Sequence, residues 1–348
     1  MYFENMSTGR RLGGSVVFAA LLGVVLVVQH RDNHSRRNLA DTSGTPKMCR
    51  TPSGYHPCEC LHTVPSGTRV EDLPDVLRLH HPDGSVHDLK QCPHSPPPQG
   101  MAPVEARMAL GSTGSASNVT KPCNLDWPHA APLEAFYEHS KDIAEFSATY
   151  TVPQPPTATA DNILYYWIGL QDLNSTANPV IQPVLSYVRG SASDNWYFAS
   201  WNCCPKGHKL EATQISVSGP GEKLRGTMAK DPKSGVYTVT SANEHGESSV
   251  LISDDTNSGL VRTWNWVDIV LETYNVADCA QYSAGGDAGF LSMKLIDVDG
   301  AHVTPTFSMA PYIDGHYLPP KEAQAFTACC SGQFRVQWPD ATMAQNAD

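Results

Sequence analysis

Short runs of apolar and aromatic residues, separated by Pro, Gly, Asn and Asp, recur from about residue 122 to residue 340. Some alternate apolar and polar side chains, as in Ala148–Val152, which is the pattern of a strand with one face on a core and the other toward water. The segments predicted as strands are Glu145–Pro153, Leu164–Leu170, Val180–Val188, Asn195–Asn202, Thr213–Val217, Lys223–Ala229, Val236–Ser241, Ser248–Ser253, Trp266–Tyr274 and Gly289–Ile296. Only the short segment Pro132–Lys141 has the pattern of a helix. We therefore expect residues 122–340 to form an all-β antiparallel sandwich with both sheets contributing to one core.

The N-terminal end of the chain carries a long apolar run. Two arginines precede Leu12–Val28, which contains no charged residue, and this predicts a signal peptide or a signal anchor within residues 1–29. A cleaved signal has small residues near its end, whereas Ala20 and Gly23 lie deep in the run, so both possibilities stay open. The large domain is expected outside the cytoplasm, either secreted or held by a type II membrane anchor at Leu12–Val28. Candidate glycosylation sites, each the Asn of an Asn-x-Ser/Thr triplet, agree with export: Asn33, Asn118 and Asn174.

Composition divides the rest of the chain outside the sandwich into four regions. These are a polar, basic tether (30–48), a small module rich in Cys and His (49–92), a linker rich in Pro, Ser and Gly (93–121) and a tail (341–348). Within the module, Val76–His81 and Ser85–Leu89 flank a Pro-Asp-Gly turn, which predicts a β-hairpin.

The chain has 10 cysteines, which in an exported protein predicts disulfide bonds. The candidates are Cys49, Cys58, Cys60, Cys92, Cys123, Cys203, Cys204, Cys279, Cys329 and Cys330. Neighbouring residues rarely reach disulfide geometry, so Cys203-Cys204 and Cys329-Cys330 are each expected to bond elsewhere, for instance to the other pair, to Cys279 or to Cys123. A zinc site built on Cys58, Cys60 and nearby histidines is a weaker alternative, because a one-residue gap departs from the usual ligand spacing. We expect no metal and no cofactor.

The net charge and the aromatic residues indicate which classes of partner the protein can bind. Lys and Arg number 24 against 35 Asp and Glu, a net charge of −11, so the chain lacks the basic surface that nucleic acid requires. Trp167, Trp196 and Trp201 lie with several tyrosines on strands expected to be neighbours. A concave face lined in this way binds an extended polymer, either a peptide or a sugar chain, although the sandwich core is the simpler place for any single tryptophan. A monomer is expected.

Two polar residues stand out on otherwise apolar strands. Gln182 lies in Pro179–Val184, and Glu272 lies in a strand where Asp268, Val270 and Glu272 share one face. An amide and an acid are costly when they are buried without partners, but they are tolerated where water enters a cleft. A solvated outer face is the alternative for each. A serine or cysteine nucleophile has no support, since there is no Gly-x-Ser-x-Gly elbow and the cysteines are expected in disulfides.

Several segments follow one another in a recognisable order between about residues 144 and 296. They are Phe146–Pro153 (FSATYTVP), Tyr166–Leu170 (YWIGL), Val180–Val184 (VIQPV), Trp196–Pro205, Ile215–Glu222 and Asp268–Tyr274 (DIVLETY). This series resembles the glutamic peptidases (eqolisins, such as scytalidoglutamic peptidase), including the strand that holds the family's catalytic glutamine and the strand whose second glutamate is catalytic.

The resemblance implies a concanavalin-like β-sandwich and an acid endopeptidase that acts on polypeptides. Carried over to this chain, Glu272 activates water and later protonates the leaving amine, while Gln182 stabilises the oxyanion. The substrate-binding residues expected from the aromatic face and the catalytic strand are Trp167, Trp196, Trp201 and Asp268. Residues 49–121 are then expected to be a propeptide that is removed to open the cleft.

The sequence departs from the family pattern in three places. Gln171 stands where the family has an acidic residue, with Asp172 one position on, and Ser200 replaces a glutamate between two tryptophans. Cys203-Cys204 adds a residue before Pro205. These departures favour a second possibility, a non-catalytic β-sandwich that binds glycan or peptide as a lectin does. A structural surface protein tethered by its N-terminal run is a third.

Overall fold

The protein is represented by a computed structural model, which describes residues 46–93, 127–158, 161–173, 179–188, 196–277, 279–283, 289–309, 312–313, 316–317 and 335–336. Their regular structure consists of strands and three single-turn 3-10 helices, Cys58–Cys60, Pro205–Gly207 and Cys279–Gln281. None of these residues is in an α-helix. The predicted all-β class is therefore confirmed.

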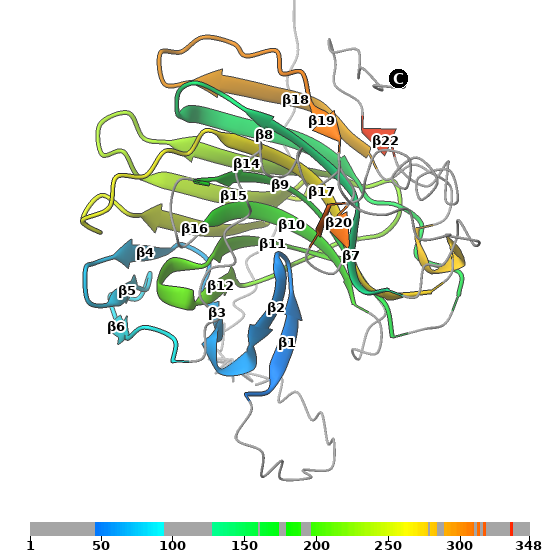
Figure 1. Ribbon diagram of the computed structural model, residues 1–348, viewed down its shortest axis with the longest axis horizontal. Helices are drawn as coiled ribbons and strands as arrows, with labels where there is room; N and C mark the ends of the chain where they lie inside the picture. The colour runs from blue at the N-terminus through cyan, green and yellow to red at the C-terminus, as the bar shows by residue number, and fades with distance from the viewer. Residues whose placement is uncertain are drawn as a thin grey trace, which may run out of the picture. The chain divides into compact units, whose positions relative to one another are not determined.

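The strands form two large sheets that pack face to face, together with one separate hairpin (Figure 1). The order in the larger sheet is β21 (His316–Tyr317), β20 (Tyr312–Ile313), β7 (Trp127–Glu138), β17 (Trp266–Val276), β9 (Ile163–Gln171), β10 (Val180–Val188), β11 (Trp196–Cys203), β12 (Lys209–Ala212) and β3 (Leu61–Val64), with β13 (Ile215–Ser216) beside β11 and β19 (Ser308–Met309) beside β7. The order in the second sheet is β22 (Arg335–Val336), β18 (Gly289–Asp297), β8 (Ile143–Thr151), β14 (Lys223–Lys230), β15 (Tyr237–Asn243), β16 (Ser248–Asp254), β4 (Thr68–Asp72), β5 (Leu77–His80) and β6 (Val86–Leu89). The separate hairpin is β1 (Met48–Thr51) with β2 (Gly54–Pro57).

The strands predicted from residue 145 onward are all present, as β8 to β11 and β13 to β18. Their interior is the space between the two sheets, where alternate residues such as Leu164, Tyr166 and Ile168 of β9 are buried in one large apolar cluster. Tyr150 of β8 spans the two layers, since its hydroxyl donates to the carbonyl oxygen of Pro183 at 2.8 Å. The alternation predicted along Ala148–Val152 is confirmed, since Ala148, Tyr150 and Val152 are buried whereas Thr149 and Thr151 are half-buried.

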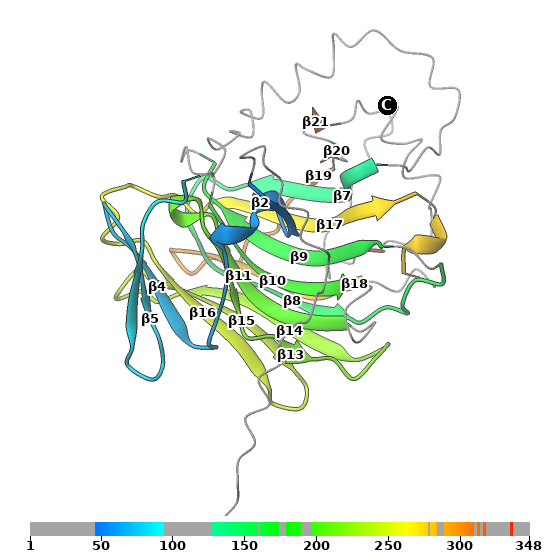
Figure 2. The ribbon, with the colours of Figure 1, turned by 90° about the horizontal axis from the view of Figure 1, so that it is seen from below.

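The outer face of the larger sheet carries a second apolar cluster, made of the residues that alternate with the core positions. Its members are Ile163, Tyr165, Trp167, Val180, Val184, Ala199, Trp201, Cys203, Val270 and Tyr274. All residues of β9 are buried, which requires cover on both faces of the sheet. The hairpin β1–β2 supplies that cover over the middle of the outer face, as Figure 2 shows.

The Cys- and His-rich module continues both sheets. Its strand β3 pairs in parallel with β12, and its strand β4 pairs in parallel with β16. The predicted hairpin within the module is confirmed as β5 and β6, which pair antiparallel beyond β4. Residues 61–89 therefore cover β12 and β16, which would otherwise be edge strands, and exposed edge strands invite pairing with other chains.

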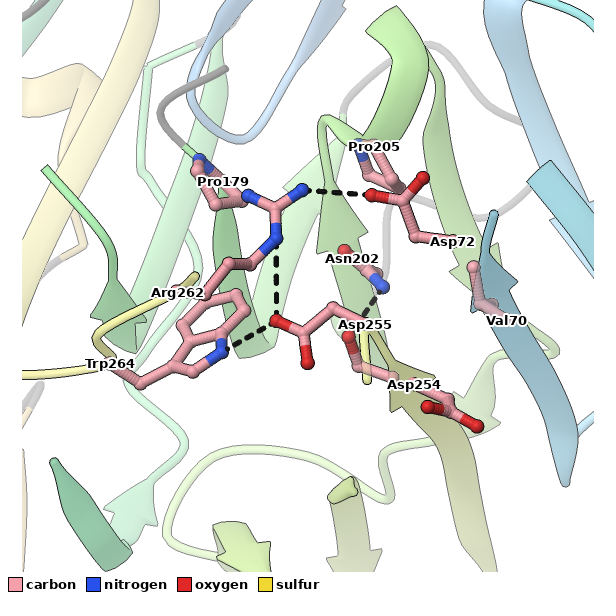
Figure 3. Close-up of a pocket in the computed structure, with 10 residues that line it drawn as sticks. Val70, Asp72, Pro179, Asn202, Pro205, Asp254, Asp255, Arg262 and Trp264 are labelled. Carbon is pink, nitrogen blue, oxygen red and sulfur yellow. Dashed lines mark hydrogen bonds and ion pairs between the residues drawn. The ribbon is translucent and has the colours of Figure 1, made fainter. Parts of the chain in front are cut away.

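A buried group of charges ties this module to the rest of the chain. Arg262, with its side chain 4% exposed, pairs with Asp72 of β4 at 2.9 Å and with Asp255 at 3.3 Å. Trp264 also donates to Asp255, at 3.0 Å, and these side chains surround a small cavity beside Asn202 (Figure 3). Removing one member of a buried ion pair leaves the other charge buried and unpaired, which is strongly destabilising. This network therefore resists separation of β4 from the large domain.

The segment Pro132–Lys141 is not a helix. Most of it belongs to β7, which pairs antiparallel with β17 along its length. The register shifts opposite Leu271 and Thr273, and Pro132 falls at this irregularity, where a strand tolerates a residue without an N–H. The prediction of a helix was wrong because the pairing with a distant strand outweighs the local pattern.

Three disulfides are described. Cys49 bonds to Cys58, and Cys60 bonds to Cys92. The expectation that neighbouring cysteines bond elsewhere was wrong for Cys203 and Cys204, which bond to each other. Their Cα atoms are only 3.1 Å apart across a cis peptide, whereas the expectation assumed a trans peptide. Cys123, Cys329, Cys330 and the side chain of Cys279 lie outside the described part.

The predicted leader Leu12–Val28 and the three candidate glycosylation sites, Asn33, Asn118 and Asn174, also lie outside the described residues. Within the described ranges, no helix has the length and apolar character needed to span a membrane.

Candidate active site

Glu272 and Gln182 lie on the outer face of the larger sheet, near its centre. Glu272 is on β17 and Gln182 is on β10, and strand β9 runs between them. Glu272 is 2% exposed and Gln182 is fully buried. Glu272 also lies where the pairing of β17 with β7 shifts register, the kind of irregularity that re-aims a side chain.

Three N–H donors contact the carboxylate of Glu272. The backbone N–H of Ser53 donates to Oε2 at 2.7 Å, and the N–H of Gly54 donates to Oε1 at 2.9 Å. The Trp167 indole N–H donates to Oε2 at 3.3 Å, and the Tyr274 hydroxyl oxygen lies 3.2 Å from Oε1. A buried carboxylate requires such donors, because without them its desolvation is strongly unfavourable.

Gln182 approaches the same segment from the other side. Its Nε2 donates to the Ser53 hydroxyl at 3.2 Å. Its Oε1 is buried and has no hydrogen-bond partner among the described residues. The two side chains singled out in the sequence, Glu272 and Gln182, therefore both contact Ser53. The side-chain carbonyl oxygen of Gln182 is left available for a further hydrogen-bond donor.

The segment that they contact is the turn of the β1–β2 hairpin, Thr51–Gly54. Thr51 pairs with Gly54, and Pro52 and Ser53 form the two-residue loop between them. Ser53 has φ of 74°, so the loop combines Pro at its first position with positive φ at its second, as a type II turn does. The turn reaches down onto the sheet, where the Tyr274 hydroxyl donates to the carbonyl oxygen of Thr51 at 2.7 Å.

A buried lysine completes the contacts of the turn. Lys209 of β12 is 1% exposed, and its Nζ donates to Thr51 Oγ1 at 2.6 Å, to the Pro52 carbonyl oxygen at 2.8 Å and to the Ser53 carbonyl oxygen at 2.9 Å. Burial lowers the pKa of the Lys209 ammonium to about 7, against the opposing effect of the Glu272 carboxylate. Lys209 was not predicted from the sequence, because it lies in the four-residue strand β12, which is too short to show a periodic pattern.

The predicted substrate-binding residues divide into two groups. Trp167 and Trp201 belong to the outer-face cluster, and Trp201 lies directly opposite Gln182 in the strand pairing. Trp196 lies instead in the core between the sheets, where its ring contacts Tyr166 and Tyr187.

Asp268 and the positions that depart from the family pattern are engaged in structural contacts. Asp268 is fully buried and accepts hydrogen bonds from Gln171 and, at 2.7 Å, from the Trp266 indole. Ser200 faces the second sheet, where its hydroxyl donates to the Ser249 carbonyl oxygen at 2.8 Å. Ser200 therefore takes part in packing between the sheets, away from Glu272 and Gln182.

Three histidines gather at the base of the hairpin. His56 Nε2 donates to the Gly207 carbonyl oxygen at 2.6 Å, and His62 lies 3.0 Å from His208 between ring nitrogens. Burial, followed by the charge of Lys209, lowers the pKa of His56 to about 4. Burial also lowers the pKa of His62 and of His208. Their surroundings therefore favour the neutral form of all three histidines.

Comparison with known proteins gives a distant similarity at the level of the fold. No protein-family model matches the chain, and no curated protein matches it. Among solved structures, scytalidoglutamic peptidase with a peptide-based transition-state analogue matches with a TM-score of 0.38 and 13% identity, over 55% of this chain and 91% of that chain. A second structure of that enzyme, with a transition-state analogue inhibitor, matches with a TM-score of 0.31 and 14% identity, over 54% and 83%.

SCP-B, a member of the eqolisin family of peptidases in complex with the tripeptide Ala-Ile-His, matches with a TM-score of 0.29 and 12% identity, over 55% of this chain and 82% of that chain. Such scores and identities are too low to say anything about the site. The function is therefore inferred from the geometry around Glu272 and Gln182.

Proposed function

We propose that the protein is an acid endopeptidase of the glutamic type, in which Glu272 activates water and Gln182 stabilises the oxyanion. The observation that carries this proposal is the convergence of the two side chains on a single peptide segment. Glu272 accepts two consecutive backbone N–H groups, of Ser53 and Gly54, and Gln182 donates to Ser53 between them. A site that already holds polypeptide backbone against a carboxylate, with an amide donating to the side chain of the same residue, supports a polypeptide substrate.

The proposed reaction uses one carboxyl group twice. The Glu272 carboxylate takes a proton from water as the water oxygen bonds to the carbonyl carbon, and the negative charge that forms on the carbonyl oxygen is stabilised by N–H donors. The C–N bond then breaks as Glu272 returns the proton to the leaving nitrogen. The products are a carboxylic acid and an amine, and Glu272 is again a carboxylate.

We further propose that the described conformation is a closed, inactive form. The turn Thr51–Gly54 donates one N–H to each oxygen of the Glu272 carboxylate, and these are the oxygens to which an attacking water has to hydrogen-bond. Within the predicted propeptide, the hairpin Met48–Pro57 is then the inhibitory element. The strands β3 to β6 that follow it are parts of the two sheets, so opening the site requires displacement or cleavage of the hairpin alone.

The three disulfides are typical of a chain that folds in an oxidising compartment. This supports the proposal of a protein that acts outside the cytoplasm. It also means that the hairpin is closed by a covalent bond at its base, between Cys49 and Cys58, while its turn lies on the site.

The test is cleavage of denatured protein by the full chain between pH 3 and pH 7, with and without acid pre-incubation. Glu272→Gln and Gln182→Ala are expected to abolish cleavage. Glu222→Gln is the matched control, because Glu222 is also buried and accepts a backbone N–H, from Ser218, but lies away from the site. Cleavage that survives Glu272→Gln would refute the proposal.

A non-catalytic peptide-binding sandwich is the second candidate. It is favoured by one observation: Glu272 and Gln182 already bind a turn of the chain itself. No cleavage under any of these conditions, together with retained binding of peptides or glycans once the hairpin is displaced, would support it.

A further inference from the structure

We propose that Lys209 is a third functional group of this site, and that its ammonium holds the carbonyl oxygen of the peptide group that is cleaved. This inference rests on the proposed function of Glu272. It assigns a catalytic role to a residue that belongs neither to the Glu272–Gln182 pair nor to the aromatic residues around it.

The hairpin turn shows how the site grips a peptide group. In the peptide unit between Pro52 and Ser53, the carbonyl oxygen lies 2.8 Å from Lys209 Nζ and the N–H lies 2.7 Å from Glu272 Oε2. In the next unit, between Ser53 and Gly54, the carbonyl oxygen lies 2.9 Å from Lys209 Nζ and the N–H lies 2.9 Å from Glu272 Oε1. Two successive peptide groups thus span the gap between the lysine and the carboxylate in the same orientation.

That orientation is the one amide hydrolysis requires. The group at the carbonyl oxygen must stabilise negative charge, and the group near the nitrogen must finally supply a proton. When water activated by Glu272 bonds to the carbonyl carbon, the electron pair of the C=O π bond moves to oxygen, where the Lys209 ammonium stabilises it. The pair returns as the C–N bond breaks, and the nitrogen takes its proton from Glu272, so Lys209 keeps its own proton throughout.

Gln182 and Lys209 divide the remaining contacts between them. In the closed form Gln182 donates to the Ser53 hydroxyl, whereas Lys209 donates to both carbonyl oxygens. The unpartnered Gln182 Oε1 can accept from a water placed between Gln182 and Glu272. Gln182 then orients the water and assists at the oxyanion, and Lys209 is the principal donor to it.

Burial makes this ammonium effective. Lys209 is 1% exposed, and the three acceptors of its ammonium all belong to the hairpin, namely Thr51 Oγ1 and the carbonyl oxygens of Pro52 and Ser53. When the hairpin leaves, a substrate carbonyl can replace these acceptors at little cost, because the donor is already fixed by the sheet. A pKa of about 7 keeps Lys209 charged throughout the acid range.

The experiment compares Lys209 variants of the full chain in an opened background. Ser53→Pro opens the site, since Pro cannot adopt the φ of 74° found at this position and lacks the N–H that Glu272 accepts. Lys209→Met removes the charge, Lys209→Arg retains it, and Lys223→Met, at an exposed lysine on β14, is the matched control. Thermal unfolding of each variant checks the fold, and Lys209→Gln is the second neutral variant if Lys209→Met does not fold.

Cleavage of an internally quenched peptide is measured from pH 3 to pH 9. Lys209→Met is expected to lower kcat roughly 100-fold with a smaller rise in KM, the loss typical of one oxyanion donor. Lys209→Arg should keep most of kcat and move the alkaline limb of the pH profile upward. A Lys209→Met enzyme with the kcat and pH profile of its Ser53→Pro parent would overturn the proposal, since a lysine that only anchors the hairpin leaves both unchanged.

A second readout does not depend on catalysis. The disulfide-closed synthetic peptide of residues 48–58 is titrated into the same Ser53→Pro proteins by calorimetry. The proposal expects binding at least tenfold weaker with Lys209→Met and within about threefold of the parent with Lys209→Arg; equal affinities would overturn it. If the opened chain shows no Glu272-dependent cleavage, the peptidase function and the catalytic role of Lys209 both fail, while the peptide affinities still decide whether Lys209 holds backbone carbonyls.

Discussion

Ser53 takes a backbone conformation that a residue with a Cβ rarely adopts. Its φ of 74° is in the left-handed region, where glycine is favoured and other residues lose about 1–2 kcal/mol. Glycine at this position would avoid that loss but would lack the hydroxyl that accepts the Gln182 hydrogen bond. Serine at the tip of the hairpin therefore provides a hydrogen bond to Gln182 at the expense of an unfavourable backbone conformation in the turn.

Gly226 shows a second constraint at the scale of a single residue. A Cβ at this position would lie 2.6 Å from Pro183 Cγ and 2.7 Å from the Tyr150 ring. Pro183 follows Gln182 directly, and Tyr150 donates to its carbonyl oxygen, so the absence of a side chain at Gly226 lets the two sheets approach behind the site.

Gly226→Ala is expected to lower the free energy of unfolding by about 1–3 kcal/mol, the usual effect of overpacking a core. It should also reduce cleavage at a pH where the variant is fully folded, because Pro183 must move and Gln182 moves with it. Denaturant unfolding and kcat measure the two effects. Lys223→Ala, at an exposed position on the same strand, should change neither; a Gly226→Ala protein as stable as the parent would contradict the packing argument.

At the scale of elements, the β1–β2 hairpin is held by contacts that depend on pH. In the closed form, burial lowers the pKa of His56, His62 and His208 below the ordinary value for histidine. The pKa of His56 is lowered to about 4. A group with a lowered pKa stabilises the closed form above its ordinary pKa of about 6.5, and this stability is lost as the pH falls through the lowered value. Acid therefore favours release of the hairpin.

We expect the closed form to open between about pH 6.5 and pH 4. Amide hydrogen exchange of residues 48–57, measured by mass spectrometry across this range and corrected for intrinsic rates, should rise as the pH falls. His56→Gln keeps a neutral N–H donor without the titration and should move opening to lower pH, whereas His302→Gln, at an exposed position, should not. Exchange that stays constant from pH 7 to pH 4 would count against the histidine mechanism.

The Cys49–Cys58 disulfide is the second device that favours the closed hairpin. It joins residues nine positions apart and restricts the free hairpin, an effect of about 2–3 kcal/mol for a loop of this length. Cys49→Ser with Cys58→Ser is therefore expected to shift opening toward neutral pH and to shorten the lag before cleavage. Cys60→Ser with Cys92→Ser is the control. This double variant is expected to have lower thermal stability and an unchanged lag before cleavage. Equal lags in both double variants would show that the Cys49–Cys58 disulfide does not hold the turn.

At the scale of the whole molecule, the N-terminal module has two separable parts. The hairpin Met48–Pro57 covers the outer face, whereas β3 and β4 pair with β12 and β16 as members of the sheets. Asp72, at the end of β4, also partners the buried Arg262. Loss of the first part opens a site, and loss of the second uncovers two sheet edges and a buried charge.

Two truncations test this division. A chain that lacks residues 1–57 and carries Cys58→Ser is expected to fold and to cleave without acid pre-incubation. A chain that lacks residues 1–93 is expected to aggregate or to unfold at a markedly lower temperature. Thermal unfolding and size-exclusion chromatography distinguish the outcomes, and a stable, monomeric second chain would show that β3 to β6 are dispensable.

Much of the sandwich was predictable from the sequence because its signals are local. Runs of apolar and aromatic residues along Val180–Val188 and Trp266–Tyr274 identify strands, and they place Gln182 and Glu272 among apolar neighbours, where a polar side chain needs an explanation. Pro132–Lys141 was misassigned, and the bond between Cys203 and Cys204 was missed, since pairing with a distant strand and the isomer of one peptide bond leave no local pattern.

By itself, then, the sequence determined the fold class and most of the strands of the sandwich, and it singled out Gln182 and Glu272 as candidates. Only the tertiary structure decided what faces them, because Ser53 and Glu272 are 219 positions apart and Thr51 and Lys209 are 158 positions apart. Contacts over such separations arise from the closure of two sheets around one core, which no short stretch of sequence encodes. For the same reason the hairpin on the site and the lysine that holds its carbonyl oxygens became visible only in three dimensions.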